Sequence, residues 1–150
     1  LYEAMRVGAS GSAVLGTIHG DGGAAVRERV VADLGVPESS FGATDLLVTC
    51  EPYHGESGRR VKSIQEVVVG EDGVRFEPLY GLTDGDLVAT GRIDRGNSRL
   101  VDEMRRSEEE YADLRRELAD RTEWLADLVA GGRTDAGSHC EAHARRRERA

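Results

Sequence analysis

Lysine is almost absent from this 150-residue chain, and cysteine and aromatic residues are scarce. Of the 20 basic residues, 19 are arginine and one is Lys62. The 28 acidic residues bring the formal net charge to −8. An acidic chain disfavours a nucleic-acid partner, because a phosphate-binding surface needs clustered positive charge. The arginine bias together with the acidic excess would also suit a salt-loving organism.

Two further absences bear on the cellular compartment. Cys50 and Cys140 have no CxxC partner and are too few for a disulfide framework, so a reducing interior is the default. No apolar run reaches the roughly 18 to 20 residues needed to span a bilayer, and residues 1–10 lack the basic and then apolar pattern of a signal peptide. The chain is therefore predicted to be cytoplasmic, with any membrane contact made through partners.

A strand, a loop and a helix are predicted near the start of the chain. Residues 12–18 read SAVLGTI, a small and apolar run typical of a strand covered on both faces in a parallel sheet. Asp21 or a nearby glycine can begin the next helix, in which Val26, Val30 and Leu34 share one face. This unit predicts an α/β fold.

The middle of the chain is typical of an antiparallel meander. Strand-like segments at 46–53, 61–70 and 74–82 are separated by polar or glycine-rich turns, after a short helical turn at 37–45. In the second segment Val61, Ser63 and Gln65 alternate with Lys62, Ile64 and Glu66. Strict alternation predicts Lys62 on the opposite face from Ser63.

The last third is predicted to be helical over residues 97–129, with a break near Ser107. One apolar stripe favours docking on a neighbouring domain over a free coiled coil; it contains Met104, Tyr111, Leu114, Leu118, Leu125 and Leu128. The small, charged segment 131–150 is predicted to be a disordered tail. The predicted organisation is therefore 1–96, 97–130 and 131–150.

His19 ends the first apolar run, immediately before a helix start. A lone histidine in such a place is most simply a capping or packing residue. Its neighbours indicate another role. The stretches EAMRVGASGSAVLGTIHGDGGAAVRERV, LGVPESSFGATDLLVTCE and RRVKSIQEVVVG resemble the C-terminal part of the type II/type IV secretion ATPases, most closely the archaeal branch. The resemblance covers about residues 1–132.

The resemblance implies the C-terminal half of a RecA-like P-loop NTPase core, with an antiparallel β extension and C-terminal helices. Thr17-Ile18-His19 would be its histidine box, with His19 sensing the γ-phosphate and with Thr17 and Gly20 as geometric supports. ATP and magnesium would bind the complete protein. Its implied partners are the N-terminal half of the same motor, five further copies in a homo-hexamer, and a membrane platform protein of a pilus, archaellum or secretion system at the inner face of the membrane.

Two expected elements of such a motor are missing. A P-loop reads G-x-x-x-x-G-K-[S/T]; only Lys62 could serve, and Val61 stands where the glycine must be. The magnesium-holding acidic strand would precede residue 1, and residues 1–8 read as a helix already under way. We therefore expect a fragment that binds no cofactor and hydrolyses no ATP alone, and that is marginal or self-associating. The alternatives are a non-catalytic interaction or regulatory module derived from this family, or a gene remnant.

Other candidate sites are weaker. His139, Cys140 and His143 could share a metal if their segment were helical, but a flexible tail is poorly preorganised, so no metal site is predicted. Cys50 and His54 have no third member for nucleophilic catalysis, which favours simple packing of Cys50. The arginines near His19 are candidate phosphate contacts, although surface ion pairs with Glu3 or Glu28 are the favoured use; they are Arg6, Arg27 and Arg29.

Overall fold

A computed structural model of the chain describes residues 2, 5, 13–53 and 58–147. It divides into two compact units, Leu1–Met104 and Arg105–Ala150. The division lies eight residues beyond the boundary predicted at 96/97. Within the described ranges, no helix combines the length and the apolar character that crossing a bilayer requires.

The first unit contains a four-stranded antiparallel sheet with strands in the order β1-β2-β3-β4. The strands are β1 (Leu46–Tyr53), β2 (Gly58–Gly70), β3 (Gly73–Thr83) and β4 (Asp86–Ala89). Each pairs with the next along the chain, which confirms the predicted meander for its three segments; β4 is a fourth strand that was not predicted.

The predicted parallel strand at 12–18 is wrong for the described residues 13–18, which have no regular secondary structure. Every strand pair of the described sheet is antiparallel, and the strand that β1 pairs with, β2, lies later in the chain. An apolar run alone does not make a strand, because its backbone needs a hydrogen-bonding neighbour. The sheet and its helices confirm that the fold combines α-helices with β-strands.

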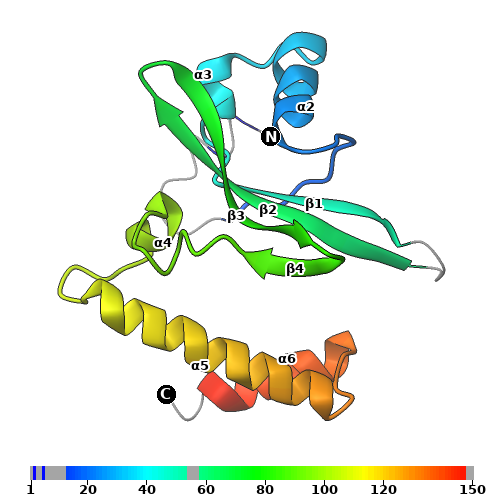
Figure 1. The fold of residues 1–150 in the computed structure, drawn as a ribbon, viewed down its shortest axis with the longest axis vertical. Coiled ribbons are helices and arrows are strands. Elements are labelled where there is room, and N and C mark those ends of the chain that lie inside the picture. Colours follow the sequence, from blue (N-terminus) through cyan, green and yellow to red (C-terminus); the bar gives the residue numbers. More distant parts are fainter. Residues whose placement is uncertain (1, 3–4, 6–12, 54–57, 148–150) are drawn as a thin grey trace. The chain divides into compact units, whose positions relative to one another are not determined.

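Helices α2 (Gly23–Glu28) and α3 (Glu38–Phe41) cover one face of the sheet (Figure 1). The core between them and the sheet contains four buried residues, Val26, Val30, Phe41 and Val67. The Phe41 ring meets Phe76 of β3 edge to face, with centroids 6.2 Å apart. The two layers are therefore held together mainly by apolar burial.

A π-helical turn, η1 (Arg29–Asp33), continues α2. Leu34 N–H bonds the Arg29 carbonyl, five residues back, at 3.0 Å. The wider turn changes the phase of the helix. Val26 and Val30 are buried as predicted, but Leu34 is 64% exposed, so its predicted place on the same face is wrong. Gly35, at φ 68°, follows the end of the helix in a backbone conformation that favours glycine.

Helix α4 (Arg99–Glu103) meets the opposite face of the sheet. Val67 points into the core below α2, so its neighbour Glu66 points the other way. There the Glu66 carboxylate accepts hydrogen bonds from the Ser98 hydroxyl at 2.6 Å and from Arg92 Nε at 3.3 Å. Arg92 also pairs with Glu77 at 3.2 Å. Both oxygens of the buried Glu66 carboxylate therefore have hydrogen-bond partners.

The second unit contains α5 (Tyr111–Ala130) and α6 (Ala136–Arg147). Leu114 and Leu128 of α5 are buried, whereas Leu125 is 44% exposed. The Trp124 ring packs against His139 of α6 in a tilted arrangement, with 5.8 Å between centroids. The break near Ser107 is confirmed, since α4 ends at Glu103. The predicted disordered tail differs from the structure, because α6 gains a packing partner in α5 that composition does not reveal.

Candidate functional site

His19 lies in the loop that leads into α2, not at the end of a strand as predicted, because residues 13–20 have no regular secondary structure. Thr17, His19 and Gly20 are all exposed. Gly20 does act as a geometric support: a Cβ there would come 2.6 Å from Val26 Cγ2, so only glycine lets the loop lie this close to α2.

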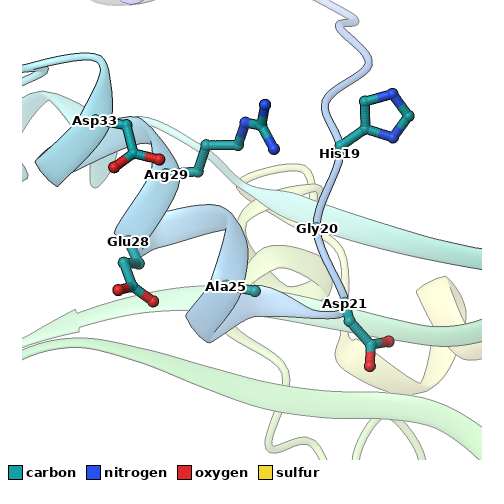
Figure 2. A pocket seen from close by; sticks show the side chains of 7 residues that line it. All are labelled: His19, Gly20, Asp21, Ala25, Glu28, Arg29 and Asp33. Carbon is teal, nitrogen blue, oxygen red and sulfur yellow. The ribbon is translucent and has the colours of Figure 1, made fainter.

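A pocket of about 340 Å³ lies between the loop and the α2–η1 helix (Figure 2). Figure 2 shows the Arg29 guanidinium reaching toward the loop, while the His19 imidazole is turned to the other side of it. Within the described part of the chain Arg29 makes no ion pair. Arg27 is engaged elsewhere, since its Nε donates to Glu38 at 3.0 Å. Of the three predicted arginines, Arg29 alone is placed at the pocket; Arg6 lies outside the described residues.

The pocket is acidic on balance. Asp21, Glu28 and Asp33 line it together with His19 and Arg29. Three carboxylates against one permanent cation repel a polyphosphate. These residues therefore cannot hold ATP alone; they fit a phosphate group only if a metal ion or cations from another part of a larger protein offset the acid charge.

The glycines after His19 let α2 begin against the sheet. Gly22 is the N-cap residue, and its φ of 96° is a backbone conformation that favours glycine. A Cβ on Gly23 would lie 2.3 Å from the Phe76 ring. The Gly23 N–H donates to Gln65 Oε1 of β2 at 3.0 Å, so a strand side chain caps the helix that has no cap of its own. Sequence reasoning placed this helix start correctly and missed Gln65.

Lys62 is tied to the same loop. Its Nζ lies 2.6 Å from Asp21 Oδ1, and the hydrogen bond and charge of Asp21 raise the pKa of Lys62 above its ordinary value of 10.5. Lys62 lies inside β2, not at a phosphate loop before a helix, in keeping with the absent P-loop motif. Strict alternation missed its role, because a β-bulge interrupts the strand at this point.

The remaining candidates are dispersed. Cys50 is exposed on β1, so its predicted packing role is wrong, and His54 lies outside the described residues. His139 and His143 both lie against Trp124. In the ranges that the structure describes, no three His, Cys, Asp or Glu side chains are placed to hold one metal ion. Comparison of the chain with models of protein families, with curated proteins and with solved structures gives no match.

Proposed function

We propose that this chain is the C-terminal part of a hexameric ATPase that powers a type II/type IV secretion, pilus or archaellum machine. Residues 13–18 and the helix after them would complete a RecA-like core whose P-loop half is another part of the motor, and the antiparallel sheet would be its β extension. The sequence resemblance around Thr17-Ile18-His19 motivates the proposal. The exposed apolar segment before His19 supports it most directly.

Among the described residues of that segment, two apolar side chains are exposed, whereas Val14 is half-buried. Leu15 is 96% exposed and Ile18 is 41% exposed. Exposed apolar runs mark surfaces that meet a partner. In the proposed motor the N-terminal half supplies strands beside residues 13–18, which then pair as the central strand that their composition favours. His19 would lie at the carboxyl end of that strand, where open α/β sheets bind ligands.

The residues of the loop have separate roles in this proposal. The His19 imidazole donates a hydrogen bond to the γ-phosphate, and Arg29 supplies a permanent positive charge nearby. Because His19 meets that phosphate only in the ATP state, its contact favours one position of the loop and α2 over another. ATP with Mg²⁺ would supply the phosphoryl group. Cations must offset the negative charge of Asp21, Glu28 and Asp33 at this pocket. The chain alone is expected to be inactive.

A non-catalytic module derived from the same family is the second candidate. The acidic pocket and the missing P-loop motif favour it, since neither suits nucleotide binding by this chain alone. In either case the partner would be the motor or its membrane platform, at the inner face of the membrane.

The test begins with the DNA immediately upstream. An in-frame P-loop and acidic strand support the motor, whereas a start codon with no P-loop before it supports the module. In the longer product, His19→Ala should abolish most ATP turnover and leave the melting temperature within about 1 °C, because the side chain is exposed. His139→Ala, in the second unit, is the control and should keep turnover. Parental turnover in His19→Ala would overturn the mechanistic role.

A further inference from the structure

A second pocket, of about 320 Å³, shares Asp21 with the pocket that His19 lines. Its walls are Asp21 and Gly22 of the loop, the first two residues of α2, and side chains of the sheet. Polar side chains from β1 and β2 project into it, and the Phe76 ring forms an apolar wall. The polar residues are Thr49, Lys62, Ser63 and Gln65. Its volume is at the small end of the range for ligand sites.

A β-bulge builds this cluster. Thr49 pairs with Ser63, but the next residue, Cys50, pairs with Val61, so Lys62 is an extra residue on β2. Consecutive residues normally point to opposite faces of a strand. The bulge re-aims Lys62, and both Lys62 and Ser63 line the pocket. Without it, the sole lysine of the chain would lie on the far side of the sheet.

The cluster has spare hydrogen-bond donors. Thr49 is 8% exposed. Within the described ranges, neither its hydroxyl nor that of the half-buried Ser63 has a hydrogen-bond partner. No fully buried polar side-chain atom in those ranges lacks a partner, so solvent can reach the Thr49 hydroxyl. Gln65 Oε1 accepts the Gly23 N–H, which leaves its NH₂ group to donate.

We propose that this pocket binds the phosphoryl group of a small ligand. An ammonium, an amide NH₂ and two hydroxyls converge from two adjacent strands, which matches a tetrahedral oxyanion with several acceptor oxygens better than a two-oxygen carboxylate. Lys62 is its single cation, and Asp21 holds that cation in this structure. The phosphoryl group competes with Asp21 for Lys62, so binding releases the loop that carries His19.

Inorganic phosphate is the probe, titrated into the 150-residue chain at constant ionic strength while backbone amide signals are followed by NMR. We expect saturable shifts at the amides of Gly22, Gly23, Thr49 and Ser63. Acetate, at the same ionic strength, should bind at least about tenfold more weakly, since it engages fewer donors. Acetate that binds as tightly as phosphate would overturn the assignment to a phosphoryl group.

Three variants localise the binding. Lys62→Met should weaken phosphate about tenfold or more, because it removes a charged hydrogen bond, and Thr49→Val should weaken it about threefold while conserving shape. Arg60→Met is the matched control: it removes another β2 cation paired with a carboxylate, Glu51, and should bind as the parent does.

Asp21→Asn gives the most specific readout. It removes the competing carboxylate, so phosphate should bind several-fold more tightly, a gain that damage to the fold does not produce. Shifts that never saturate, or equal losses in Lys62→Met and Arg60→Met, would show charge screening and overturn the proposal. The outcome is independent of ATP turnover, so the site and the proposed motor function can fail separately.

Discussion

The Ser98 hydroxyl donates a 2.6 Å hydrogen bond to the carboxylate of Glu66, a side chain that is 1% exposed. The same hydroxyl accepts the Val101 N–H at 3.3 Å and so caps α4. One side chain therefore both satisfies a buried charge and begins a helix.

Ser98→Ala is expected to lower the free energy of unfolding of the first unit by about 3 kcal/mol, because it loses a hydrogen bond to a buried charge and a helix cap. The sole tryptophan, Trp124, lies in the second unit, so urea unfolding should be followed through amide signals of β2. Ser39→Ala, at an exposed helical position, is the control and should change little. A loss below about 0.5 kcal/mol in Ser98→Ala would contradict the dual role.

Gly23→Ala should destabilise the first unit by about 2 kcal/mol, because the added methyl would overlap the Phe76 ring. It should also shift the amide signals of α2 as the helix start moves away from the sheet. At Gly58 a Cβ would meet nothing within 4 Å, so Gly58→Ala serves as the matched control, with an expected change within about 0.5 kcal/mol. Equal stability of the two variants would mean that α2 does not rest on Phe76.

Because of the π-helical turn, substitutions of two apolar residues four positions apart should affect stability differently. Val30 is 3% exposed, so Val30→Ala should cost about 2 kcal/mol of unfolding free energy. Leu34→Ala should cost less than about 0.5 kcal/mol, since its side chain is 64% exposed. Urea unfolding of both variants measures the two losses of free energy. Similar losses would indicate that Leu34 lies on the buried face, as it would in a regular α-helix.

Helix α6 should fray at acid pH. Hydrogen bonds from Ser138, including its N–H at 2.9 Å, lower the pKa of Asp135 below its ordinary value of 3.8. A lowered folded-state pKa contributes stability that is present above the ordinary value and lost as the pH falls through the lowered one. The Ser138 and His139 amide signals, followed from pH 6 to pH 2, should report this loss below about pH 4.

Asp135→Asn is the control for that titration, because asparagine caps a helix without a titrating charge. Its α6 amides should hold steady over the same range. If they fray at the same pH as in the parent chain, the transition belongs to another group.

The local parts of the fold were predictable from the sequence. Strand β1 has the predicted bounds, 46–53, because its mainly apolar run is followed by a polar, glycine-containing segment that marks a turn without tertiary information. The start of α2 was also predictable, from the glycines beside Asp21. In these segments, local composition and tertiary packing agree.

Long-range pairing decided the rest. Residues 13–18 have the composition of a buried strand but find no neighbour in the described sheet. The bulge at Thr49/Cys50 is set by pairing between β1 and β2, so strict alternation put Lys62 on the wrong face. Charged composition likewise concealed α6, whose contact with Trp124 lies across the helix pair. The hypothesis for His19 came from the residues around it and stays a prediction, whereas Gln65 and Thr49 carried no local signal.

Because Lys62 is the one lysine of the chain, its side chain can be followed by covalent labelling. Amine-reactive reagents also acylate the terminal α-amino group, so label on Lys62 is identified by peptide mapping; no other side chain in the chain carries an ammonium group. Acylation requires the neutral amine, and Asp21 keeps that form scarcer than in an ordinary lysine by raising the pKa. The rate of labelling therefore measures how much of the time the loop before α2 is held against the sheet.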